Sequence, residues 1–71
     1  MDKIIGFRAY HHGENRYLHF DHRTGRNYLD ASKPEPIARS DAHRRIAAFL
    51  DQPGHEHDDD FSIDPIFATS A

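Results

Sequence analysis

Apolar and polar residues alternate in three short segments near the start of the chain. Residues 3–10 place Ile5, Phe7 and Ala9 on one side and Ile4, Gly6, Arg8 and Tyr10 on the other. A period of two residues is typical of half-buried β-strands. The same alternation recurs twice more, so we expect strands at residues 3–10, 16–21 and 26–30.

Two polar segments separate these strands. Residues 11–15, HHGEN, contain Gly and Asn, which tolerate positive φ angles and allow the chain to reverse. Residues 21–25, DHRTG, predict a hairpin loop in which Gly25 takes the left-handed position of a type I turn with a bulge. The three strands are therefore expected to form an antiparallel meander.

One helix should follow the meander. Residues 30–36, DASKPEP, hold two prolines and predict an extended connector. Ser40 is a good N-cap residue, and Pro53-Gly54 should end the helix. A capping-box pattern at residues 32–35 offers an earlier start, which we disfavour because Pro36 lacks a helical amide. Apolar residues then recur on a single helical stripe, formed by Ala42, Ile46, Phe49 and Leu50.

These elements predict an α+β fold, a three-stranded antiparallel β-meander with one α-helix packed on one face. We expect the helix to cover the sheet face that carries Ile5, Phe7, Leu18 and Phe20. Residues 61–63 predict a short C-terminal edge strand, which Asp64-Pro65 would end or confine to the sheet edge.

No second helix is available for the opposite face of the sheet. That face is expected to carry one isoleucine and the three tyrosines of the chain, which makes it a candidate interface. The residues are Ile4, Tyr10, Tyr17 and Tyr28.

A length of 71 residues allows one small core, and the absence of cysteine excludes disulfides and thiolate metal sites. Oligomerisation is the natural remedy for so small a core, so a homodimer is expected. The apolar run near the N-terminus is too short for a secretory signal or a membrane span. We therefore expect a soluble protein of the cytoplasm, which would be that of a bacterial host if the gene belongs to a phage.

Charge divides the chain in two. Residues 1–52, the expected βββα domain, carry nine Lys and Arg against seven Asp and Glu, a net charge of +2. Residues 53–71, an acidic C-terminal tail, carry five acids and no base, a net charge of −5. The tail either solubilises the protein or docks through its apolar residues as a short strand. Its candidate contacts for a basic groove on a partner are Asp58, Asp59, Asp60, Phe61 and Asp64.

Two histidine clusters are candidates for metal binding or catalysis. His55 and His57 stand beside three aspartates, but two imidazoles cannot complete a tetrahedral metal site. His19 and His22 flank Asp21 without a nucleophile or an enclosing pocket. We therefore expect neither a metal or cofactor nor an enzymatic activity.

Nucleic-acid binding is the alternative function. Arg23 and Arg26 could contact phosphates while Tyr17 and Tyr28 stack on bases. Phosphate binding needs a clustered positive field, however, and a net charge of +2 is weak. Direct nucleic-acid binding is thus the less favoured hypothesis.

The first half of the chain resembles a WW domain, a three-stranded meander that binds proline-rich peptides. The matching positions are Gly6-Phe7, residues 17–20, residues 21–24 and Leu29. Leucines at positions 18 and 29 replace the aromatic pair that grips proline, and the closing proline is displaced to Pro34. The resemblance supports the meander and argues against recognition of proline-rich peptides.

The whole chain is similar in profile to phage-encoded anti-CRISPR proteins, which are short, acidic and cysteine-free. No motif carries this likeness. It implies stoichiometric binding to a Cas subunit, at a basic surface that serves nucleic acid. We therefore expect a small non-enzymatic protein-binding module, an inhibitor of a bacterial defence complex, acting through the acidic tail residues and the tyrosine-bearing face.

Overall fold

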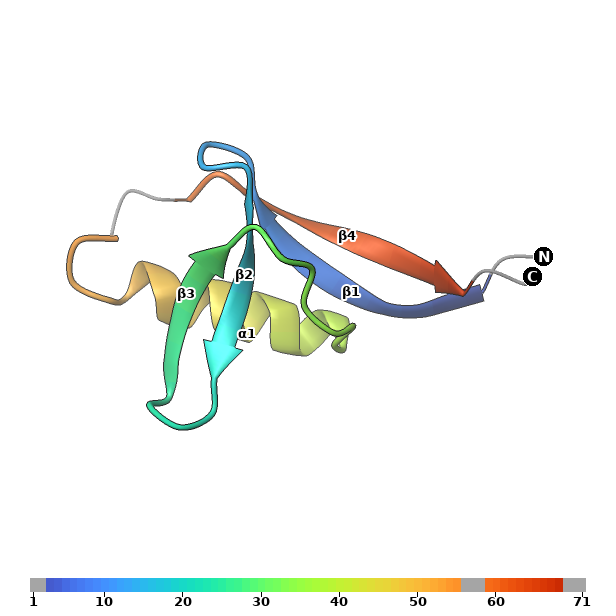
Figure 1. Cartoon of the computed structure of the whole chain (residues 1–71), viewed down its shortest axis with the longest axis horizontal. Coiled ribbons are helices and arrows are strands. Elements are labelled where there is room, and N and C mark those ends of the chain that lie inside the picture. Colours follow the sequence, from blue (N-terminus) through green and yellow to red (C-terminus); the bar gives the residue numbers. More distant parts are fainter. Residues whose placement is uncertain (1–2, 56–58, 69–71) are drawn as a thin grey trace.

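A computed structural model describes residues 3–55 and 59–68 of the chain. Four strands and one helix follow the order β1, β2, β3, α1, β4 (Figure 1). Their bounds are Lys3–His11 for β1, Arg16–Asp21 for β2, Arg26–Asp30 for β3, Arg39–Leu50 for α1 and Phe61–Ala68 for β4. The predicted α+β class and the antiparallel meander are confirmed, and the sheet has a full fourth strand.

The sheet order is β3-β2-β1-β4, with every neighbouring pair antiparallel. β4 pairs with β1 along its whole length, from Lys3 opposite Ala68 to His11 opposite Phe61. The predicted C-terminal strand is thus confirmed as an edge strand, but it is eight residues long rather than three.

Pro65 does not end β4, for a geometrical reason. It lies opposite Phe7, whose N–H and C=O both bond to Ile37, at 2.8 and 3.0 Å. Phe7 therefore directs its hydrogen-bonding groups away from β4, and Pro65 occupies a position where no bond to β1 is made. The missing proline N–H faces the free edge, where the sheet tolerates it.

The turns follow the sequence closely. Gly25 has a φ of +72° and donates its N–H to the Asp21 carbonyl at 2.7 Å. The Asp21 carboxylate accepts the Arg23 N–H at 2.9 Å, which fixes the loop from within. In the β1–β2 turn it is Asn15, with a φ of +55°, that takes the left-handed conformation.

Helix α1 begins earlier than predicted. The N-cap residue is Ala38, in extended conformation and without a side-chain cap, so Ser40 lies inside the first turn. The pairing of Ile37 with Phe7 explains the shift, because it anchors the chain to β1 immediately before the helix. The helix ends at Leu50, before Pro53-Gly54, as expected.

The core lies between α1 and the middle of the sheet. Ala9, Leu18, Ala42 and Phe49 are buried within the described part of the chain. Three partly buried residues surround this cluster, namely Leu29, Ile46 and Phe61. The predicted helix stripe is therefore confirmed at its central positions.

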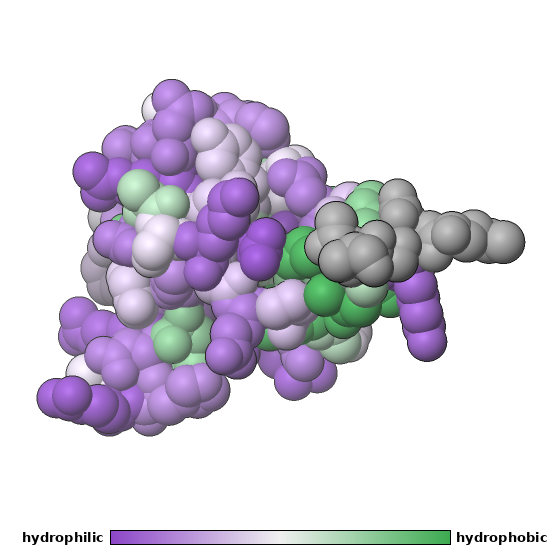
Figure 2. Space-filling view, turned by 45° about the vertical axis from the view of Figure 1, so that its right-hand side comes forward, coloured by the Kyte–Doolittle hydropathy of each residue, from purple (hydrophilic) through white to green (hydrophobic). Residues whose placement is uncertain are grey.

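The prediction that Ile5 belongs to the core is wrong, because its side chain is 54% exposed. Residues 3–7 of β1 and 65–68 of β4 form a two-stranded ribbon, here called the arm, which projects past the N-terminal end of α1 (Figure 1). Everything else that is described, here called the body, gathers around α1. Figure 2 shows the strongest hydrophobic colouring where the arm leaves the body.

Candidate functional site

The three tyrosines lie on the sheet face opposite α1, here called the tyrosine face. Strand register places Tyr10 opposite Tyr17 on β2 and Tyr28 opposite His19. The Tyr10 and Tyr17 rings meet edge to face at a centroid distance of 5.0 Å, and His19 stacks on Tyr28 at 5.3 Å. An aromatic band therefore crosses β1, β2 and β3.

A polar chain extends this band to β4. The His12 ring contacts Tyr10 edge to face, and its Nε2 lies 2.8 Å from the Ser62 Oγ. The Ser62 hydroxyl donates to the Asp64 carboxylate at 3.0 Å. Ser62 is opposite Tyr10 in the sheet, so this series of hydrogen-bonded side chains lies on the tyrosine face.

The order of these groups differs from that of a nucleophilic triad. In a triad the imidazole stands between the hydroxyl and the carboxylate and takes the hydroxyl proton. Here Ser62 stands in the middle and directs its proton to Asp64. The arrangement fixes the orientation of His12 and Asp64 at the surface.

Acidic groups border the tyrosine face on two sides. Asp30 is opposite Tyr17, and Asp64 is opposite Arg8. The Ser32 hydroxyl and then the Ser32 backbone N–H hydrogen-bond the Asp30 carboxylate and lower its pKa. Asp60 is exposed beside the β1–β2 turn, and its carbonyl accepts the His12 N–H at 2.9 Å.

The connector between β3 and α1 covers part of this face. The Ser32 carbonyl lies 2.7 Å from the His19 Nε2, and the Pro34 carbonyl accepts the Arg8 Nε–H at 2.7 Å. The face is thus less open than the absence of a second helix indicated. Tyr28 remains 46% exposed.

The structure does not bring all the predicted contact residues together. Tyr10, Tyr17, Tyr28 and Asp64 share the tyrosine face, and Asp60 adjoins it. Asp59 is exposed, while Asp58 lies outside the described residues.

Phe61 points toward α1 instead, where its ring meets Phe49 at 5.5 Å and His11 at 4.8 Å. The sequence predicted Phe61 as an apolar anchor in the groove of a partner. Its ring packs into the core of its own chain, so the structure gives no reason to place Phe61 in contact with a partner.

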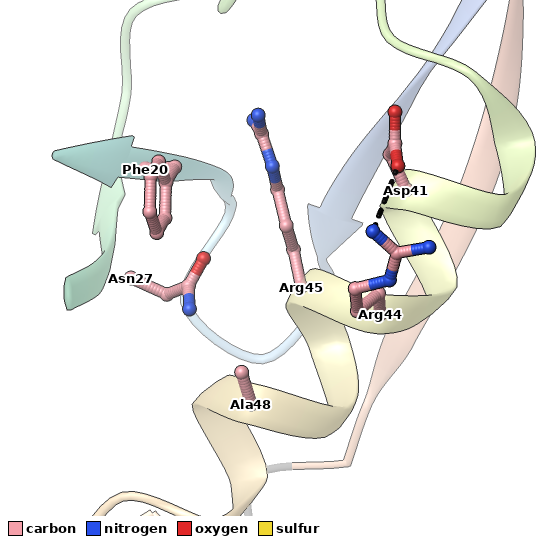
Figure 3. Close-up of a pocket in the computed structure, with 6 residues that line it drawn as sticks. All are labelled: Phe20, Asn27, Asp41, Arg44, Arg45 and Ala48. Atoms are coloured by element: carbon pink, nitrogen blue, oxygen red, sulfur yellow. Dashed lines mark ion pairs between the residues drawn. The ribbon is translucent and has the colours of Figure 1, made fainter. Parts of the chain in front are cut away.

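A concave site lies apart from the tyrosine face, between α1 and the β2–β3 hairpin (Figure 3). It encloses about 300 Å³ and is lined by Phe20, Asn27, Asp41, Arg44, Arg45 and Ala48. The Arg45 guanidinium stands 5.1 Å from the centroid of the Phe20 ring, a cation–π contact. Arg44 pairs with Asp41 at 3.5 Å.

Asn27 is the unusual member of this pocket. It is only 5% exposed, and its Oδ1 has no hydrogen-bond partner. Figure 3 shows its amide directed from β3 toward α1. The sequence patterns did not predict this pocket, although one signal for it is a polar residue, Asn27, two positions before Leu29 on the side of β3 that faces α1.

The histidine pair considered for metal binding is only half described. The His55 ring stacks on Phe49 at 4.3 Å, and His57 lies outside the described residues. Among residues 3–55 and 59–68, no group of three or more His, Cys, Asp or Glu side chains could hold a metal ion. Over the same residues, no helix has the length and apolar character needed to cross a membrane.

In comparisons with known proteins, no family model, no curated protein and no solved structure matches the chain.

Proposed function

We propose that this chain is a small non-enzymatic protein-binding module that binds its partner through the tyrosine face. One observation carries the proposal, the gathering of Tyr10, Tyr17 and Tyr28 on the sheet face that no helix covers. Tyrosine is enriched in protein interfaces because it adds a large contact area and a hydroxyl at low entropic cost.

The border of the face indicates the chemistry of the partner. Asp30, Asp60 and Asp64 place carboxylates around the aromatic band, and tyrosine rings attract cations over their faces. A partner surface rich in Arg and Lys would satisfy both groups. The nucleic-acid groove of another protein has this character, and a Cas subunit is the narrower form of the proposal.

Tyrosine fluorescence provides a direct test, since the chain has three tyrosines and no tryptophan. All three report on the proposed face. A synthetic arginine-rich peptide should change this fluorescence saturably, and Asp64→Asn should weaken its binding several-fold. Asp51→Asn removes an equal charge from the far end of α1 and should leave the affinity unchanged.

Equal losses in the two variants would reduce the effect to general electrostatic attraction and contradict the proposal. The Cas form has its own test, in which the protein competes with guide or target nucleic acid for a purified Cas subunit. Competition that survives Asp64→Asn and Tyr17→Ala would exclude the tyrosine face as the site.

The nucleic-acid alternative keeps one supporting observation. Arg26 is opposite Asp21 and shares a face with Tyr28, two residues along β3. A gel-shift titration with single-stranded DNA and RNA at low salt separates the two functions. Retardation that is lost in both Arg26→Gln and Tyr28→Ala, and persists in Asp64→Asn, would favour the alternative.

A further inference from the structure

The arm carries an apolar surface that nothing in the described chain covers. Ile4, Ile5 and Phe67 are 47%, 54% and 49% exposed, and with Tyr28 they are the exposed large hydrophobic residues of the described chain. Residues 4–7 and 65–68 include no charged side chain. Such depletion of charge is typical of the centre of an interface between proteins.

The arm also lacks the support that an isolated ribbon needs. Two paired strands are marginally stable in water unless a third strand or a helix packs on them. Ile4 pairs with Phe67, while Ile5 is the extra residue of a β-bulge. Among the described residues, the connector supports the base of the arm, through the pairing of Ile37 with Phe7 and the close approach of Pro36 to Gly6, and no third strand pairs with residues 3–6.

The chain is more extended than a compact monomer of the same length. Its radius of gyration is 12.6 Å, whereas a compact domain of this length would have about 11 Å. Its accessible surface is 5250 Å², whereas a monomer of this mass would expose about 4500 Å². The excess is close to the roughly 800 Å² that each partner buries in a standard interface.

We propose that the arm is the dimer interface and that its occupant is the arm of a second copy. A two-fold axis across the arm would place the tip of one copy against the base of the other. Ile4 pairs with Phe67 on one face of the arm, whereas Lys3 and Asp64 alternate with them and lie on the other face. The face formed by Ile4 and Phe67, which has no charged side chain, would pack against its own equivalent.

Cysteine cross-linking tests this arrangement in the full chain. The protein has no cysteine, so a single introduced thiol can form a disulfide only with a second copy. Phe67→Cys should give a cross-linked dimer rapidly under mild oxidation at concentrations where the wild-type protein is a dimer. Tyr28→Cys, at a similarly exposed position on the body, should cross-link far more slowly.

Sedimentation equilibrium provides the second measurement. The wild-type protein should be a dimer, and Phe67→Asp should be a monomer with an unchanged circular dichroism spectrum. Tyr28→Asp should remain a dimer. A wild-type protein that stays monomeric up to millimolar concentration would overturn the proposal, as would a dimer that both Phe67→Asp and Phe67→Ser leave intact.

The arm and the tyrosine face are separate surfaces, so the two proposals fail independently. A monomer that still binds the arginine-rich peptide would refute only the dimer. If Phe67→Asp unfolds the chain, the relative cross-linking rates of Phe67→Cys and Tyr28→Cys still decide the question. Equal rates would overturn the arm as the interface.

Discussion

Strand β1 runs through both the body and the arm, and its apolar residues are buried to very different extents in the two regions. Ala9, in the body, is 3% exposed, whereas the larger Ile5, in the arm, is 54% exposed. In the body, β1 pairs with β2 and β4 and has α1 against one face. Burial along this strand therefore depends on what covers each position more than on how hydrophobic the residue is.

The two outer edges of the sheet differ in a similar way. On β3, the Gln52 side chain accepts the Asn27 N–H at 3.1 Å and donates to the Asn27 carbonyl at 3.2 Å, as a neighbouring strand would. On β4, Pro65 removes one donor from the free edge. The outer edge of β3 is therefore hydrogen-bonded to the Gln52 side chain. The outer edge of β4 has one N–H donor fewer with which another strand could pair.

The largest expected effect contrasts two phenylalanines. Phe49→Ala empties the centre of the core and should lower the free energy of unfolding by about 3–5 kcal/mol. Phe67→Ala should change it by less than about 1 kcal/mol in dilute protein, because the side chain is already half exposed. Urea denaturation measures both, and equal losses would erase the distinction between body and arm.

Gly6 marks the junction of the two regions. A Cβ at this position would lie 2.5 Å from the Pro36 Cβ, so Gly6→Ala should destabilise the protein by about 1–3 kcal/mol. Gly13→Ala should cost less, since its nearest contact is a His11 ring atom at 3.1 Å. Thermal unfolding of both variants checks the order, and a harmless Gly6→Ala would show that the connector can move away from β1.

Removing the partner of the β3 edge should have a moderate effect. Gln52→Ala deletes both hydrogen bonds to Asn27 and should lower stability by about 1–2 kcal/mol. Gln52→Glu keeps the acceptor and should be intermediate. Hydrogen exchange of the Asn27 amide should accelerate in Gln52→Ala, and an unchanged rate would mean that this edge is protected by other means.

The smallest effect concerns Asp30. Ser32→Ala removes the hydroxyl that lowers the pKa of the Asp30 carboxyl, so this pKa should rise toward its usual value. A lowered pKa in the folded state stabilises the fold above the unfolded pKa, and the effect is lost as pH falls through the folded pKa. An NMR pH titration measures the shift. Thr24→Ala, in the other turn, should leave the Asp30 titration unchanged.

Local pattern predicted the meander well, because its determinants are close in sequence. Alternation and the turn at Asp21–Gly25 placed β2 and β3 at their observed bounds. The stripe containing Ala42 and Phe49 identified the buried side of α1. These features depend on neighbours within a few residues.

Features that depend on distant segments were predicted less well. Ser40 is not the N-cap residue because Ile37 is anchored to β1, and β4 continues through Pro65 because that residue faces a free edge. The sequence leaves open whether the C-terminal segment docks on the sheet, so it does not show that Phe61 packs against Phe49 in the core. The pocket beside Asn27 requires knowledge of how α1 crosses β3.

The pairing of β1 with β4 also sets the order in which the fold can be completed. The β2–β3 hairpin and α1 join residues that are close in the chain. Lys3, by contrast, pairs with Ala68 and cannot do so until that residue has been synthesised. Contacts of such long sequence separation form late. A ribosome must therefore make nearly all of this sequence before β1 gains its partner on that side. During that interval β1 of one nascent chain can accept β4 of another, which would exchange the strands between two copies while keeping every contact of the arm.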